Sequence, residues 1–242
     1  MRFSALLIND LIIWAKRPTT AVSMGFAVMV VVLGLIGAST RAPLFPAVLG
    51  GPAIAVVNGR IHAGSDGIWF VTSALFVTTS LNLIDVHDAW VDLMLVRGLS
   101  RIRWTMVRLV ALMVGAMVFM GILVSVLGVA LLIGWRHTPF ITSTTAWDMG
   151  VWVLCLISLG WFAMALELWL GTTWWSLMIT WLLLGVARFG GEVSPYIPFS
   201  QSIVALHHLP GTLGIRVGAS YLGVWTMASG ATVLWGSRHH RR

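Results

Sequence analysis

The chain contains little charge. Charged residues make up 10% of its 242 positions and only eight are acidic, while 58% are hydrophobic and the mean hydropathy is +0.92. This composition excludes an ordinary soluble domain and predicts a polytopic membrane protein. The formal net charge of +7 does not indicate nucleic-acid binding, because the basic residues cluster at the ends of apolar segments and form no single basic face.

Several chemical signatures are also absent. Cys155 is the only cysteine, which excludes an intrachain disulfide and a cysteine metal cluster. No GxxxxGK[ST] phosphate loop occurs, so the chain is not itself an ATPase. The long apolar runs contain no histidine, no HExxH and no paired carboxylates, which argues against an intramembrane enzyme without excluding one. An intramembrane protease or lipid-modifying enzyme stays as one alternative, and a noncatalytic membrane scaffold or immunity protein as another.

Six apolar runs approach the length of about 20 residues that a helix needs to cross a bilayer. We therefore predict an all-α fold with six transmembrane helices in one membrane domain, residues 1-242. The predicted spans are Thr20 to Ser39, Ile68 to Leu83, Thr105 to Gly134, Met149 to Leu168, Trp174 to Ala187 and Gly218 to Trp235.

The distribution of Lys and Arg predicts the orientation, because cationic segments stay on the cytoplasmic side. With both termini cytoplasmic in the plasma membrane, the inner segments hold ten basic residues and the outer segments five. The inner set is Arg2, Lys16, Arg17, Arg97, Arg101, Arg103, Arg108, Arg238, Arg241 and Arg242; the outer set is Arg41, Arg60, Arg136, Arg188 and Arg216.

Residues 1-17 form a predicted interfacial helix that precedes the first span. Lys16, Arg17 and Pro18 stand where a signal peptide would have small residues for cleavage, so we expect the segment to be retained. Pro18 favours a break before the first span; a plain extension of that span is the alternative. On a helical wheel the apolar side holds Phe3, Leu7, Leu11 and Trp14, with Asn9, Asp10 and Lys16 elsewhere.

Two predicted outer connections are long. Residues 40-67 contain several prolines and glycines and stay apolar, which favours a position against the headgroups. Residues 189-214 contain three prolines around a moderately apolar stretch. We predict a broken, re-entrant outer hairpin there, which is allowed where protein or water satisfies its backbone.

Residues 85-104 form a dense charged island on the predicted cytoplasmic side. Asp85, Asp88 and Asp92 lie at helical spacing and share one stripe. A Gly-Leu-Ser break follows, and then Arg101 and Arg103 lead into the third predicted span. A short acidic helix, a break and a basic re-entry predict a docking platform for a soluble partner; an ordinary positive-inside loop with a few solvated acids is the alternative.

The run VRGLSRIRWTMVRL, behind a charged short helix, resembles the coupling loop of type-2 ABC exporter permeases. The resemblance extends to the N-terminal helix, the six spans and the broken outer hairpin. It implies a noncatalytic transporter subunit that forms the substrate path as a homo- or heterodimer beside a separate cytosolic ATPase. ATP and Mg would be bound by that ATPase, and this chain would hold no cofactor.

The resemblance also implies a role for the charged island. Closure of the ATPase subunits would push on Asp88, Trp90 and Asp92 and move the flanking spans, while the arginines would pair with acids on the ATPase or with membrane lipids. The implied coupling residues are Asp85, Asp88, Trp90, Asp92, Arg97, Arg101 and Arg103. The apolar lining and the lack of a large outer domain favour a lipid, drug or small peptide as substrate over a long polysaccharide.

Glu167 is the only acidic residue inside a predicted span. A carboxylate within a membrane is a candidate functional group, so Glu167 is a candidate residue of the transport pathway. A position near the headgroups, or a neutral carboxyl bonded to a neighbouring helix, is the alternative.

Overall fold

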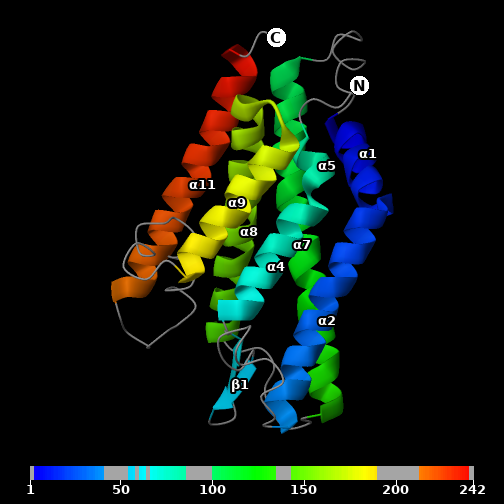
Figure 1. Ribbon diagram of the computed structural model, residues 1–242, viewed down its shortest axis with the longest axis vertical. Helices are drawn as coiled ribbons and strands as arrows, with labels where there is room; N and C mark the ends of the chain where they lie inside the picture. The colour runs from blue at the N-terminus through cyan, green and yellow to red at the C-terminus, as the bar shows by residue number, and fades with distance from the viewer. Residues whose placement is uncertain are drawn as a thin grey trace.

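The computed structural model describes residues 3–40, 54–57, 60–63, 66–85, 100–134, 143–189 and 213–239. These residues form eight helices and one two-stranded sheet, and the long helices run side by side (Figure 1). The helices are α1 (Phe3–Lys16), α2 (Pro18–Thr40), α4 (Asp66–Thr79), α5 (Leu81–Ile84), α7 (Arg101–Gly134), α8 (Ser143–Leu170), α9 (Thr173–Phe189) and α11 (Leu213–His239).

Each of the six predicted spans coincides with helix, the second being divided between α4 and α5. The fold is all-α, as predicted, apart from one short hairpin. Strands β1 (Ile54–Val57) and β2 (Arg60–Ala63) pair antiparallel, with Ile54 opposite Ala63, inside the connection expected to lie against the headgroups. A hairpin satisfies backbone groups that an irregular apolar segment would leave unpaired.

The described helices include fewer clear membrane spans than the six predicted. Within α7 and α8, Arg101–Val126 and Met149–Leu170 are each long and apolar enough to cross a bilayer, and α1 with α2 forms a bent pair that meets the same criteria together. The apolar stretches of α4 and α9, Phe70–Thr79 and Thr173–Ala187, are shorter. By length and composition the chain is therefore a helical membrane protein with two such helices, or three with the bent pair, among the residues described.

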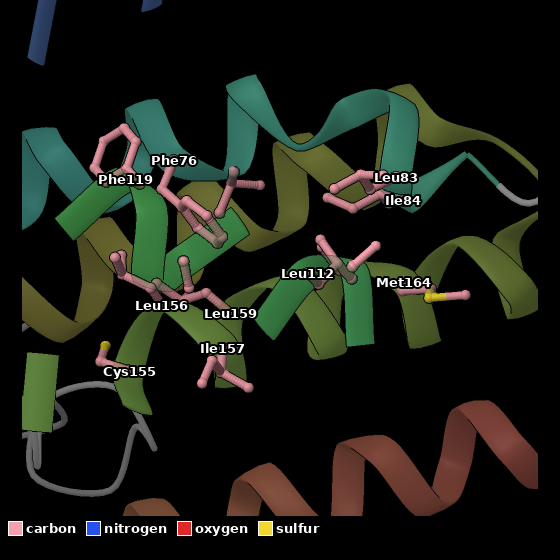
Figure 2. Packing of buried hydrophobic residues seen from close by; sticks show 14 of the residues in the cluster. Phe76, Leu83, Ile84, Leu112, Phe119, Cys155, Leu156, Ile157, Leu159 and Met164 are labelled. Atoms are coloured by element: carbon pink, nitrogen blue, oxygen red, sulfur yellow. The ribbon is translucent and has the colours of Figure 1, made fainter. Parts of the chain in front are cut away.

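The centre of the core lies between α4 and α5 on one side and α7 and α8 on the other. Figure 2 shows Phe76 of α4 near Phe119 of α7, and Leu83 of α5 facing Leu112 of α7. The two phenylalanine rings meet edge to face, with centroids 5.5 Å apart, a geometry that contributes about 1 kcal/mol beyond burial. All four side chains are at most 2% exposed. These contacts join the second and third predicted spans into one packed unit.

Glycines allow α8 to approach its neighbours closely. A Cβ at Gly160 would lie 3.3 Å from the Leu112 side chain of α7, and one at Gly230 of α11 would lie 2.8 Å from the Trp161 ring. Trp161 also donates a hydrogen bond of 3.1 Å from Nε1 to the Leu109 carbonyl of α7. One tryptophan of α8 therefore contacts both α7 and α11.

The break before the first predicted span is confirmed. Helix α1 ends at Lys16, α2 begins at Pro18, and the two axes differ by 66°. Proline is favourable at the first position of a helix because that position needs no backbone N–H donor. The amide N–H groups of Thr20 and Ala21 donate to the Arg17 carbonyl and start α2.

Helix α1 buries Leu6, Asp10 and Trp14, so its one acidic side chain faces the protein. Phe3, on the apolar side of the helical wheel, is 40% exposed, and the interfacial position of α1 stays a prediction. Asp10 is buried because α1 packs on α7, where its partner Arg108 is buried as well.

Candidate functional site

The structure describes the two ends of the predicted coupling segment, 85–104. Asp85 is half-buried at the C-terminal cap of α5 and donates its backbone N–H to the Leu81 carbonyl. Ser100 directly precedes α7 and caps it: its hydroxyl accepts the Arg103 amide N–H at 3.3 Å, and its carbonyl accepts the Trp104 amide N–H at 3.1 Å. Serine is a favoured N-cap for this reason, and α7 starts at Arg101, four residues before the predicted span from Thr105.

The predicted coupling residues are only partly described. Arg101 and Arg103 are exposed on the first turn of α7. In Figure 1, α5 ends and α7 begins in the upper part of the bundle, where α1 also begins. The remaining four residues lie outside the described part of the chain: Asp88, Trp90, Asp92 and Arg97. The predicted outer hairpin, 189–214, lies outside it as well, apart from the helix ends that flank it.

The helix leading into the segment is interrupted at Ser80. In a continuous helix the Leu83 amide would donate to the Thr79 carbonyl; here it donates to the Ser80 carbonyl, at 2.8 Å. The Thr79 carbonyl is thereby released from the helical ladder and needs another donor, because a buried carbonyl without one is costly.

The bent pair α1–α2 supplies these donors. The Trp14 indole Nε1 donates to the Thr79 carbonyl at 2.9 Å, and the Thr20 hydroxyl donates to the same oxygen at 3.4 Å. Trp14 and Thr20 lie on either side of the α1–α2 break, and both are buried. These two hydrogen bonds therefore hold the α1–α2 break against the interruption between α4 and α5.

A buried ion pair joins α1 to α7. The Arg108 Nε lies 3.1 Å from Asp10 Oδ2, with side chains only 5% and 8% exposed. The Arg108 guanidinium carbon also lies 4.9 Å from the centroid of the Trp104 ring, within the range of a cation–π contact. We call Asp10, Trp14, Thr79, Trp104 and Arg108 together the α1–α7 junction.

The α1–α7 junction fixes the first turns of α7 to α1. Removing one partner of a buried ion pair typically costs 3–5 kcal/mol, since the other charge stays buried without its counter-ion. Leu83 and Ile84 are at most 2% exposed on the other side of the segment. A displacement of the residues between α5 and α7 would therefore also displace these packed helices.

Glu167 is fully buried on α8, four residues before the turn at Gly171, whose positive φ of 70° favours glycine. Ala163, one turn earlier on the same side of α8, accepts a hydrogen bond at its carbonyl from the Ser176 hydroxyl of α9. Glu167 lies on the same side of α8 as Ala163, and this side contacts α9. A structural role for its buried side chain is therefore an explanation beside the predicted pathway role.

Sequence reasoning missed the Asp10–Arg108 pair and the Trp14–Thr79 hydrogen bond. One signal was available for the first, because Leu6, Asp10 and Trp14 recur every four residues and so share one face. No group of three or more His, Cys, Asp or Glu that could hold a metal ion occurs among the residues that the structure describes.

Comparison with known proteins adds no family: no protein-family model and no curated protein matches the chain.

Proposed function

We propose that this chain is the membrane subunit of an ATP-driven exporter of the type-2 ABC class. Two such subunits, identical or different, form the substrate path, and a separate cytosolic ATPase binds ATP and Mg. The substrate is a lipid, drug or small peptide. The observation that carries the proposal is the packing of α5 and α7 on either side of the charged segment, which gives that segment firm attachments at both ends.

The coupling step follows from those attachments. Movement of the segment displaces α5 through Leu83 and Ile84, and displaces α7 through Trp104, since all three side chains are buried. Both helices pack on α8, which carries Glu167. Displacement at the charged segment is thereby transmitted along packed helices toward a buried carboxylate, as a transporter with external ATPases requires.

The proposed topology has six spans with both termini in the cytoplasm of the cell. Helix is present at all six predicted positions, and the ten-to-five distribution of basic residues favours this orientation. Arg101 and Arg103, exposed at the start of α7, then lie on the ATPase side. Asp66 is the first residue of α4 and lies toward the outer side.

The first experiment is gentle purification from native membranes, identification of co-purifying chains by mass spectrometry, and an ATP hydrolysis assay. A stoichiometric partner with a Walker motif is expected. The double reversal Asp88→Lys/Asp92→Lys should lower coupled ATPase activity. The matched reversal Asp66→Lys/Asp148→Lys, in the first turns of α4 and α8 that the proposed topology places on the outer side, should not. Absence of any ATPase, under conditions that preserve a control complex, would refute the exporter assignment; equal effects of the two reversals would refute the coupling segment alone.

A further inference from the structure

Helix α1 has the reverse of the usual amphipathic arrangement. Its charged Asp10 faces α7, while Ala5, Ile8, Ile12 and Ala15, which share one side at helical spacing, are all exposed. Ile8 is 56% and Ile12 46% exposed. A helix on a water-facing surface places polar side chains outward, so this outward face of α1 is suited to hydrocarbon and not to water.

Basic residues adjoin the outward face of α1. Lys16 and Arg17 are exposed at the α1–α2 break. Asp10 is buried against Arg108 and adds no negative charge to this surface. Among the residues whose side chains the structure describes, every exposed charged side chain is basic. The surface therefore combines an apolar helix face with a positive end.

The position of the break matches the level of lipid headgroups. Helix α2 has 23 residues, which give a length of about 35 Å, and the hydrocarbon core is about 30 Å thick. If α2 crosses the bilayer, as the proposed topology requires, Lys16 and Arg17 lie at the membrane surface. Exposed Val22 and Phe26 follow on α2, on the hydrocarbon side of these cations.

We propose that α1 and the α1–α2 break form a binding surface for anionic phospholipid. Acyl chains contact the exposed apolar residues of α2, headgroup phosphates contact Lys16 and Arg17, and the outward face of α1 lies at the boundary between headgroups and acyl chains. Burial of the Asp10 charge against Arg108 is what allows α1 to turn an uncharged face to the lipid. This surface depends on α2 crossing the membrane and not on the exporter assignment.

The test is native mass spectrometry of the full chain released from nanodiscs that contain phosphatidylglycerol and phosphatidylcholine in equal amounts. The wild-type chain is expected to retain phosphatidylglycerol preferentially. Each basic side chain at an anionic surface contributes about a fivefold gain in affinity, so Lys16→Gln/Arg17→Gln should lower the preference by about 25-fold. The matched variant Arg241→Gln/Arg242→Gln removes the same charge from a part of the chain outside this surface and should retain most of it.

Three results would overturn the inference. The first is an unchanged preference in Lys16→Gln/Arg17→Gln, and the second is an equal loss in both double variants, which would indicate a net-charge effect without a site. The third is loss of a co-purifying protein from Lys16→Gln/Arg17→Gln with lipid retention unchanged, which would assign the surface to a protein partner. None of these results depends on ATPase activity, so the inference and the exporter proposal can fail separately.

Discussion

The strongest prediction concerns the buried pair Asp10–Arg108. Asp10→Asn leaves the Arg108 guanidinium buried without its counter-ion, and we expect a loss of about 4 kcal/mol, because removing one partner of such a pair typically costs 3–5 kcal/mol. For a chain of this length about 3 °C of melting temperature corresponds to 1 kcal/mol. The expected decrease is therefore about 12 °C, followed by tryptophan fluorescence during heating in detergent.

A double-mutant cycle separates the pair from its surroundings. The single variants of the cycle, Asp10→Leu and Arg108→Met, should each destabilise the protein, because one charge of the pair then stays buried without the other. Asp10→Leu/Arg108→Met removes both charges and should recover most of the stability, since apolar replacement of a whole buried pair is often neutral or better. Arg103→Gln, on an exposed residue of the same helix, should change stability by about 0.5 kcal/mol or less.

Two results would refute this reasoning. A decrease below about 2 °C for Asp10→Asn would mean that the pair is solvated and contributes as little as a surface ion pair. A double variant whose loss equals the sum of the two single losses would mean that Asp10 and Arg108 act independently.

Two further predictions follow from the packing, and a third follows from the distribution of basic residues. Gly230→Ala should lower the free energy of unfolding by about 1–3 kcal/mol through overpacking, because its Cβ would meet the Trp161 ring at 2.8 Å. The control Gly223→Ala has no atom within 4 Å of the new Cβ and should be neutral or stabilise α11 by up to about 1 kcal/mol. Equal melting temperatures of the two variants would contradict the close approach of Gly230 to Trp161. Trp14→Phe keeps an aromatic ring but removes the donor to the Thr79 carbonyl, so a loss of about 1–2 kcal/mol is expected, and an unchanged melting temperature would show that the bond contributes nothing. A C-terminal protease-cleavable tag should be cleaved in inverted vesicles and protected in right-side-out vesicles, and the opposite pattern would overturn the proposed topology.

The elements that the sequence predicted well depend on local chemistry. Long apolar runs predicted helix at six positions, and Pro18 predicted the break before α2. In both cases the signal comes from the residues of the element itself, either hydropathy or a fixed φ.

The elements that it predicted poorly depend on a partner distant in the sequence. The burial of Asp10 on α1 was not predicted, because it depends on Arg108, which lies 98 residues later in the chain. Nothing near Asp10 in the sequence identifies Arg108. Likewise the indole of Trp14 bonds a carbonyl that is free to accept it only because α4 is interrupted at Ser80. Partner choice of this kind is a tertiary property and no local pattern encodes it.

The interruption at Ser80 also bears on how α4 can belong to a membrane span. Helix α4 has 14 residues, about 21 Å, which falls short of a hydrocarbon core of about 30 Å; only continuation into α5 brings the segment near the required length. A break within a membrane is tolerated where protein satisfies the released backbone groups. Trp14 of α1 and Thr20 of α2 donate hydrogen bonds to the Thr79 carbonyl and so satisfy it. In the proposed six-span topology, the bent pair α1–α2 thus supplies the donors that a break between α4 and α5 within the membrane would need.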